Sequence, residues 1–509
     1  MPEYQSYDLI VAGGGSAGCI IASRIAENGI NPTTGDRLRV ALIEGGPYLL
    51  TGKEPLRPGY GVPSRRRAIA NISYLGFSVQ PWPYDGHQNK MVGGCGLHWN
   101  GSAYLPLSAD YDHWRRETGV DWSKDKFKIA TEEIVKSHNL HPAVLGNMVL
   151  GNNIFRDAAR AMGYEPTLVE MARKNCIKSG YCGAGHMCKY DAKGGSLYYI
   201  CLAEENGVEI ISDSEVEQVI IEKQGARAFA RGIYYTQHGK RKEARAPKVI
   251  VACGTAGTPV VLMRSGYGPK KVLGDRMIVE NNNVGEHLDG DMSHGVEALF
   301  DVDIKESRGG VERYQFMLPN SQGKIGEHTM QFLDTNMASV DGAYPHLLAM
   351  HKFAPELGWA HKQFMQTASR RLGAIAARVG APTWEKGTVD LEGRYQYNRR
   401  NLMVLKSLRE GTQLLIELYR TMDIPPVQID ATLPTRYSLG HQMSSCRAGE
   451  SPKNSVVNSD FECHDIENLF LSSAAVIPRG ALSHAHMPTC ITAAYAWRRI
   501  IENHFSRGV

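Results

Sequence analysis

Two histidines near the end of the chain, His441 and His486, are the residues best suited to acid–base chemistry. The pKa of an imidazole lies close to neutral pH, so a histidine can take a proton from a substrate and release it later. A second imidazole can hold the same substrate atom in position. A single histidine is more often structural, but two in one region of the chain predict a pair of bases that act on a substrate.

A glycine-rich turn near the start of the chain has the context of a dinucleotide-binding site. Residues 8–12 predict a strand, residues 16–27 a helix and residues 38–43 a second strand. Free N–H groups at a helix N-terminus bind a pyrophosphate. Glu44, after the second strand, would accept hydrogen bonds from the ribose hydroxyls. The residues expected at the turn are Gly13, Gly15, Ser16, Ala17 and Gly18. The alternative is a tight turn in an α/β protein without a nucleotide.

Motifs farther along the chain indicate which dinucleotide is bound. Residues 91–101 read MVGGCGLHWNG and residues 254–268 read GTAGTPVVLMRSGYG, while HQMSSCR and HMPT stand near the C-terminus. In this order they resemble the motifs of the glucose-methanol-choline (GMC) oxidoreductases, which are flavoproteins. The His-Trp form of the first motif resembles the sugar-oxidising branch, which includes pyranose oxidases and gluconate or glucose dehydrogenases. Tyr267 departs from the family, which usually has an aliphatic residue there.

The resemblance implies an α/β fold. A Rossmann-type FAD-binding domain, similar to that of p-hydroxybenzoate hydroxylase, would be interleaved with a smaller α+β substrate-binding domain. We expect the FAD-binding domain to be discontinuous and to contain residues 1–50, 85–105, 190–300 and 430–509. The substrate-binding domain and its cap would then contain residues 51–84, 106–189 and 301–429.

One segment of the substrate-binding domain has apolar residues at helical spacing. They are Phe364, Ala368, Leu372, Ile375 and Ala376, and basic residues flank them. The spacing predicts a helix. An ordinary solvated helix over a core is one interpretation, and a cationic helix that meets a membrane or a partner is the other.

The resemblance also implies roles for single residues. His441 takes the position of the family's general base, and His486 falls where relatives have a second His or an Asn on the same oxygen. The alignment leaves His484 as the alternative for this second position. Contacts to the cofactor would come from Gly94, His98, Trp99, Asn100, Val216, Ala474 and Pro488. In some pyranose-oxidising relatives the residue equivalent to His98 is bonded covalently to the flavin, so His98 either forms this bond or packs against the ring.

A last helix is expected over residues 489–503. If it begins under the flavin ring, its positive end stabilises the negative charge of the reduced flavin. Ser473, Ala474 and Ala475 stand where relatives usually have an acidic residue, so the cofactor contacts of this turn differ from those of the family.

Three of the ten cysteines lie close together, at Cys176, Cys182 and Cys188. Some relatives hold an iron–sulfur cluster with a nearby set of cysteines. The spacing in this chain is not that of a standard metal or cluster site. We therefore expect a turn-rich loop rather than an iron–sulfur cluster, and no metal ligands elsewhere.

Composition limits the remaining possibilities. The chain has 509 residues, enough for two domains, and its 57 basic and 53 acidic residues give a net charge of only +4. We therefore expect no nucleic-acid partner. No apolar run reaches the roughly 20 residues that span a bilayer, and no signal peptide precedes the first strand. These features predict a soluble cytoplasmic protein, or a periplasmic one if a partner carries the export signal.

Three functions are compatible with the sequence. The first is FAD-dependent oxidation of a hydroxyl group of a sugar, glycoside or polyol to a carbonyl, with His441 as base, by a dehydrogenase rather than an oxidase. The second is oxidation of an apolar aryl, sterol or fatty alcohol. The third is a flavin electron-transfer subunit of a dehydrogenase complex. The electron acceptor would be a quinone, a cytochrome, a small subunit or oxygen, and the chain could form homo- or hetero-oligomers.

Overall fold

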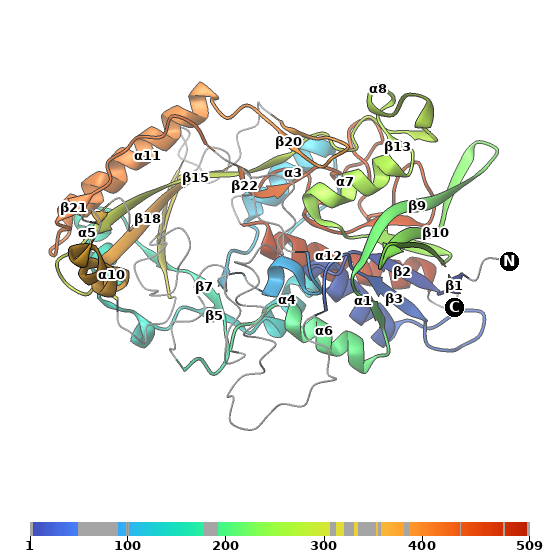
Figure 1. Cartoon of the computed structure of the whole chain (residues 1–509), viewed down its shortest axis with the longest axis horizontal. Coiled ribbons are helices and arrows are strands. Elements are labelled where there is room, and N and C mark those ends of the chain that lie inside the picture. Colours follow the sequence, from blue (N-terminus) through green and yellow to red (C-terminus); the bar gives the residue numbers. More distant parts are fainter. Residues whose placement is uncertain are drawn as a thin grey trace.

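Two sheets form the centres of two parts that lie side by side in the computed structural model (Figure 1). A parallel sheet lies on the right of Figure 1, and a larger, antiparallel sheet lies on the left. The structure describes residues 4–48, 90–97, 99, 101–177, 192–305, 312–319, 330–333, 353–354, 358–380, 386–437, 439–481 and 484–505.

The parallel sheet has five strands in the order β23-β12-β2-β3-β8. Its strands are β2 (Leu9–Ala12), β3 (Val40–Ile43), β8 (Glu209–Ile211), β12 (Lys248–Val251) and β23 (Leu469–Leu471). β2, β3 and β23 are buried along their whole length. Short, continuously apolar strands are typical of a parallel sheet that is covered on both faces. The predicted Rossmann-type α/β fold is therefore confirmed.

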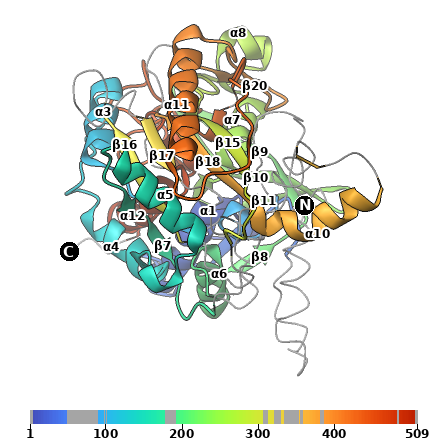
Figure 2. The same ribbon diagram turned by 90° about the vertical axis from the view of Figure 1, so that its left-hand side faces the viewer.

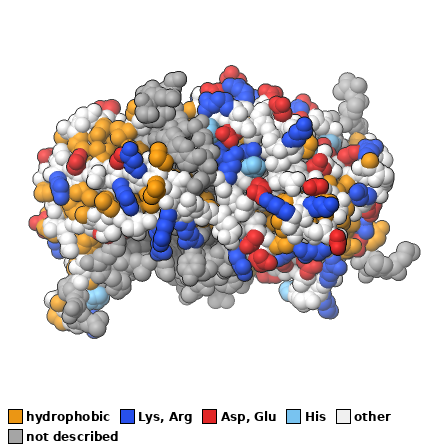
Figure 3. Space-filling view, turned by 90° about the horizontal axis from the view of Figure 1, so that it is seen from above, with side chains coloured by type: hydrophobic (Ala, Val, Ile, Leu, Met, Phe, Trp, Pro, Cys, Tyr) orange, Lys and Arg blue, Asp and Glu red, His pale blue; other side chains and the backbone are white. Residues whose placement is uncertain are grey.

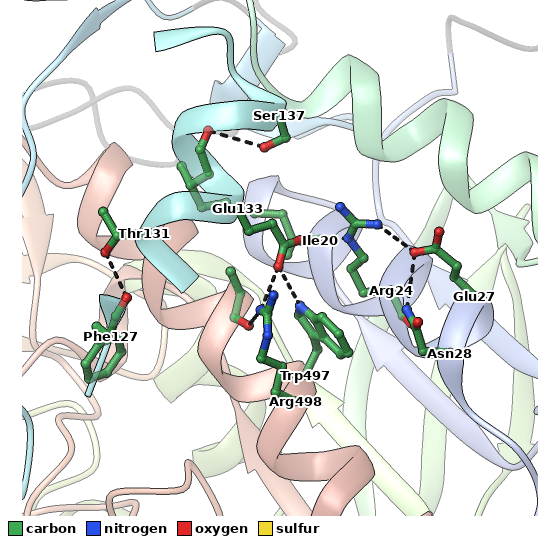
Figure 4. A network of polar contacts seen from close by, with 12 residues as sticks. Ile20, Arg24, Glu27, Asn28, Phe127, Thr131, Glu133, Ser137, Trp497 and Arg498 are labelled. Atoms are coloured by element: carbon green, nitrogen blue, oxygen red, sulfur yellow. Dashed lines mark hydrogen bonds and ion pairs between the residues drawn. The ribbon is translucent and has the colours of Figure 1, made fainter. Parts of the chain in front are cut away.

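Three helices beside this sheet are joined through one buried carboxylate. They are α1 (Ser16–Asn28), α4 (Lys128–Ser137) and α12 (His486–His504). Figure 4 shows the contacts of Glu133 on α4, which accepts hydrogen bonds from Arg24 Nε at 2.7 Å and from Trp497 Nε1 at 3.2 Å. Arg498 pairs with the same carboxylate at 2.6 Å. Glu133 thereby joins the second half of α1 to the second half of α12.

A second sheet of four strands, ordered β1-β11-β10-β9, packs beside the first. Its strands are β1 (Gln5–Ser6), β9 (Ser214–Gln224), β10 (Arg227–Gln237) and β11 (Lys240–Arg245). The chain then enters β12 and α7 (Gly254–Arg264), and α7 contains most of the second predicted flavin motif. The remaining described elements on this side include α3 (Ser108–Thr118), α6 (Ser196–Glu205), α8 (Lys270–Leu273), β13 (Tyr267–Gly268) and β14 (Val279–Glu280).

The seven-stranded sheet has a face covered by helices and a face that looks toward the parallel sheet. Figure 2 shows α5 (Leu150–Ala161) and α11 (Leu402–Thr421) in front of it. Apolar side chains on this face alternate along each strand and form a core with the helices. The strands are β6 (Thr167–Leu168), β15 (Asp289–Leu299), β16 (Tyr314–Leu318), β17 (Met330–Leu333), β18 (Leu372–Val379), β21 (Gln428–Ile429) and β22 (Leu439–Met443).

Small sheets connect these parts. Strands β4 (Ser102–Ala103), β7 (Glu170–Ala172) and β5 (Leu140–Pro142) form one, and β19 (Thr388–Val389) pairs with β20 (Tyr395–Gln396). Strand β15 lies within the range 190–300 that was expected in the FAD-binding domain, yet its hydrogen bonds join it to the seven-stranded sheet. The domain boundaries otherwise stay a prediction.

The helix expected around residues 364–376 is only partly correct. Helix α10 (Trp359–Arg371) ends where strand β18 begins, so Leu372, Ile375 and Ala376 belong to a strand. Strand β18 pairs with β15 on one side and β17 on the other. These two ladders outweigh the local helical pattern, because tertiary pairing overrides a weak propensity.

Charged side chains of both signs are interspersed on the face seen in Figure 3, over the part that contains the parallel sheet. Hydrophobic side chains are more frequent on the left of that view, over the part that contains α11. In the described part of the chain, no helix is both long enough and apolar enough to cross a bilayer.

Candidate active site

The glycine turn between β2 and α1 requires glycine at two positions and leaves open space at a third. Gly13 has φ +105°, and a Cβ on Gly18 would lie 1.9 Å from the Gly13 carbonyl oxygen. A Cβ on Gly15 would meet no atom within 4 Å. Gly15 is the N-cap of α1, and no side chain caps the first turn, which includes Ser16 and Ala17. The helix N-terminus is therefore suited to a pyrophosphate.

Glu44 lies at the carboxyl end of β3, beside this turn. It is buried, and its two carboxylate oxygens accept hydrogen bonds from Gly14 N at 2.7 Å and Gly46 N at 2.8 Å. Burial raises the pKa of this carboxyl group, although the two backbone bonds act in the opposite direction. Each oxygen keeps a further lone pair, so the residue fits the predicted contact with a ribose.

The loop that contains the predicted flavin motif packs against the same turn. Gly93 N donates to Gly14 O at 2.7 Å, and Gly94 has φ +49°. A Cβ on Gly96 would clash with both Ser16 and Ser196, whose hydroxyl groups lie 3.0 Å apart. The motif and the glycine turn therefore form one continuous surface.

The other predicted cofactor contacts are spread over three elements. Val216 lies on β9, Ala474 begins a short 3-10 helix and Pro488 lies in the first turn of α12. Trp99 donates from Nε1 to Gly194 O at 3.0 Å. His98 and Asn100 lie outside the described residues, so the covalent link at His98 stays a prediction.

His441 lies on β22 with φ +45° and is partly exposed. Its Nδ1 is 2.7 Å from Asp291 Oδ2 on the neighbouring strand β15. Arg378 on β18 forms an ion pair with the same carboxylate, which is 1% exposed. Burial alone would raise the pKa of Asp291, but Arg378 and His441 outweigh it and lower the pKa to about 2.

The ionised Asp291 sets the tautomer of His441. A carboxylate can only accept a hydrogen bond, so the neutral imidazole must carry its proton on Nδ1. The lone pair is then on Nε2, which makes this nitrogen the available base. The arrangement is a His–Asp pair in which the carboxylate orients the ring and stabilises its protonated form.

The second histidine beside His441 is His484, the alternative position, and not His486. The ring centroids of His441 and His484 are 4.1 Å apart. Tyr104 stacks on the His484 ring with a centroid distance of 4.2 Å. Burial lowers the pKa of His484 well below its usual value, and positive charge on Arg378 acts in the same direction. His484 is therefore neutral at physiological pH.

His486 begins α12 three residues before the expected start of that helix, and its ring lies against Trp99 with a centroid distance of 4.1 Å. Its Nε2 is 3.7 Å from Cys490 Sγ. His486 therefore lies beside Trp99 of the first predicted flavin motif and not beside His441. Because residues 484 and 486 differ by only two positions, the alignment alone does not distinguish them.

Two residues of the site were missed by sequence reasoning. Arg378 lies in the apolar strand β18, and Asp291 lies in β15, which comes from a distant part of the chain. A signal was present, because charged residues inside apolar strands are rarely buried unless they are paired. Arg378 within residues 372–379 shows this pattern, whereas Asp291 lies in a polar stretch that gives no such signal.

Two family models described as GMC oxidoreductase match residues 7–289 and residues 381–494. The chain belongs to the GMC oxidoreductase family. It is accordingly a FAD-dependent enzyme that acts on CH-OH groups, and the residues of the glycine turn fit this cofactor.

Individual relatives cover nearly the whole of this GMC chain. It is 25% identical to the oxygen-dependent choline dehydrogenase of Chromohalobacter salexigens, over 97% of this chain and 94% of that protein. It is 22% identical to the long-chain-alcohol oxidase FAO1 of Arabidopsis thaliana, over 96% of this chain and 65% of that protein. The solved structure of pyridoxine 4-oxidase from Mesorbium loti has a TM-score of 0.71 at 15% identity, over 98% of this chain and 99% of that chain.

The cysteine group is only partly described. Cys176 is partly exposed, and Cys182 and Cys188 lie outside the described residues. Whether these cysteines bind a cluster therefore stays a prediction.

Replacement of Gly15 by leucine is expected to weaken FAD binding by about tenfold or more, which is about 1.4 kcal/mol. The new side chain points into open space, so the chain folds but the pyrophosphate position is filled. Gly146→Leu is the matched control, since a Cβ at Gly146 also meets no atom within 4 Å. FAD titration by fluorescence measures both variants, and equal affinity in the two would contradict the assignment of the turn.

Proposed function

We propose that this GMC enzyme oxidises a hydroxyl group of a sugar, glycoside or polyol to a carbonyl, with His441 as the general base. The observation that carries the proposal is the His441–Asp291 pair beside the neutral His484. Together the two rings can bind one hydroxyl oxygen, one of them as proton acceptor.

His441 Nε2 accepts the hydroxyl proton, and the Asp291 carboxylate stabilises the protonated ring that results. His484 hydrogen-bonds the same oxygen through Nε2, which has no hydrogen-bond partner within the described part of the chain. FAD, when bound, supplies the acceptor for the hydride that leaves the carbon. His441 thus removes the proton, and His484 orients the oxygen.

The polar face of the seven-stranded sheet favours a hydroxyl-rich substrate. A continuous row of buried or half-buried polar side chains crosses four strands, and we name it the polar ladder. Arg378 Nη1 donates to Gln331 Oε1 at 2.9 Å, and Gln331 Nε2 donates to Gln315 Oε1 at 2.5 Å. The polar ladder consists of Asp291, Arg378, Gln331 and Gln315.

A polar wall of this kind disfavours an apolar alcohol. Asp291, Arg378 and Gln331 are almost completely buried and bond to one another, so Gln315 is the member of the ladder that keeps part of its surface exposed. An alkyl chain that covers Gln315 would leave its remaining donors and acceptors without partners, and this costs free energy. Hydroxyl groups of a sugar or polyol can replace the lost water. The likeness to a long-chain-alcohol oxidase supports the apolar alternative, so the two classes must be compared directly.

Anaerobic mixing of the FAD-loaded enzyme with a panel of hydroxyl compounds tests the proposal. Sugars and polyols are expected to bleach the visible flavin absorbance faster than aliphatic alcohols of equal carbon number. Faster bleaching by the aliphatic alcohols would overturn the substrate class. Absence of bleaching by every hydroxyl compound would overturn the proposed function.

A further inference from the structure

The charges around the two histidines do not balance. Asp291 is paired with Arg378, and Glu312 is paired with Arg173 at 3.4 Å, all four side chains being almost completely buried. Arg313 is also buried, with 3% of its surface exposed. Among the residues that the structure describes, no carboxylate forms an ion pair with it. Within the described residues, the Arg313 guanidinium therefore has no counter-charge.

The strand pattern places Arg313 on the polar face of the sheet. It directly precedes β16, where Tyr314 and Phe316 belong to the apolar core beneath the helices. Side chains alternate along a strand, so Arg313 lies on the same face as Gln315, the last member of the polar ladder.

Two further observations place Arg313 close to the reacting groups. Its carbonyl oxygen accepts a hydrogen bond from Val169 N at 3.0 Å, and Val169 packs in one cluster with Tyr104. Tyr104 in turn stacks on His484. The positive charge of Arg313 also contributes to the lowered pKa of His484.

A buried guanidinium without a counter-charge is unfavourable until an anion binds to it. Its planar fork of N–H donors matches a carboxylate in two parallel hydrogen bonds. Such a residue therefore adds selectivity for an acid over a neutral compound of the same shape.

We propose that the substrate carries a carboxylate as well as the reacting hydroxyl group, which makes it a sugar acid or a related polyhydroxy acid. Arg313 holds the carboxylate, while His441 and His484 hold the hydroxyl. This inference rests on the proposed function and specifies its substrate class further.

Kinetics with matched substrates test the assignment. Each polyol or sugar is compared with the acid of the same carbon chain and with its phosphate ester, using the wild type, Arg313→Gln and Arg313→Lys. Arg313→Gln is expected to lower kcat/KM for the acid by about a hundredfold and for the neutral compound by about threefold or less. Arg313→Lys, which keeps the charge, is expected to recover part of the loss. Arg160→Gln is the control, since Arg160 is an exposed arginine on α5.

Two outcomes would overturn the inference. Equal losses for acid and neutral substrates in Arg313→Gln would show that the residue acts on the reaction itself. A preference of the wild type for the neutral compound or the phosphate ester would exclude the carboxylate.

Binding without turnover separates this inference from the proposed function. A sugar acid is expected to perturb the flavin spectrum of His441→Asn, and this perturbation is expected to disappear in the double variant with Arg313→Gln. If no hydroxyl compound reduces the flavin but the acid still binds through Arg313, only the proposed function fails.

Discussion

Replacement of His441 by asparagine is expected to lower the rate of flavin reduction by about 10²–10⁴-fold, because the variant has no imidazole to accept the hydroxyl proton. Asparagine is chosen because residue 441 has φ +45°, a conformation that asparagine tolerates better than alanine. Stopped-flow mixing with a saturating substrate under anaerobic conditions measures the rate. The FAD content should equal that of the wild type, since the described contacts of His441 are with side chains of the substrate site.

His238→Asn is the matched control for this experiment. His238 also has a left-handed backbone, with φ +50°, but it lies exposed in the turn between β10 and β11. The control should keep wild-type activity. If His441→Asn also keeps a rate within a factor of about three of the wild type, His441 is not the base.

Asp291→Asn is expected to lower kcat by about 10²–10⁴-fold, although Asp291 itself touches no substrate atom in the proposed reaction. The amide can donate a hydrogen bond to Nδ1, which favours the wrong tautomer and leaves no lone pair on Nε2. The change also leaves Arg378 without its counter-charge in a buried position, at a cost of about 3 kcal/mol or more in the free energy of unfolding. Thermal unfolding and steady-state kinetics measure the two effects separately.

Asp289→Asn is the control for the loss in the free energy of unfolding. Asp289 lies two residues away, is equally buried and pairs with Arg479 at 2.9 Å, but it does not contact His441. We expect the control to lose stability with a smaller loss of kcat. In Asp291→Asn alone, the acid limb of the pH profile of kcat/KM should move to lower pH, because the protonated ring loses its anionic partner. An unmoved pH profile would contradict the positioning role of Asp291.

The parts of the protein that depend on neighbouring residues could be predicted from the sequence. The turn at Gly13–Gly18 is one example, since strand, glycines, helix and terminal acid follow one another within 44 residues. The close contact between Gly13 and Gly18 and the start of α1 involve only residues within this motif, so the motif determines the geometry of the turn. The helix around Phe364 was also correct up to Arg371 for the same reason.

The parts that depend on distant pairing could not be predicted. Asp291 and His441 meet because β15 and β22 are antiparallel neighbours with Asp291 opposite Gly440. A shift of this register by one residue would turn one of the two side chains to the other face. Strand β18 likewise follows its two partners rather than its own helical spacing. Which of His484 and His486 faces His441 depends on the path of the chain into α12, which local patterns do not encode.

The two faces of the seven-stranded sheet carry different constraints on mutation. Side chains such as Phe316, Phe332 and Ile375 pack under α5 and α11, so changes there reduce stability. Each of four strands contributes one residue to the polar ladder, and the members of the ladder point away from that core. Substitution of Asp291 or Arg378 breaks a buried ion pair and also reduces stability, whereas substitution of the half-buried Gln315 can change which compound is accepted while the fold persists. Such a sheet allows related enzymes to diverge in substrate preference through few mutational steps.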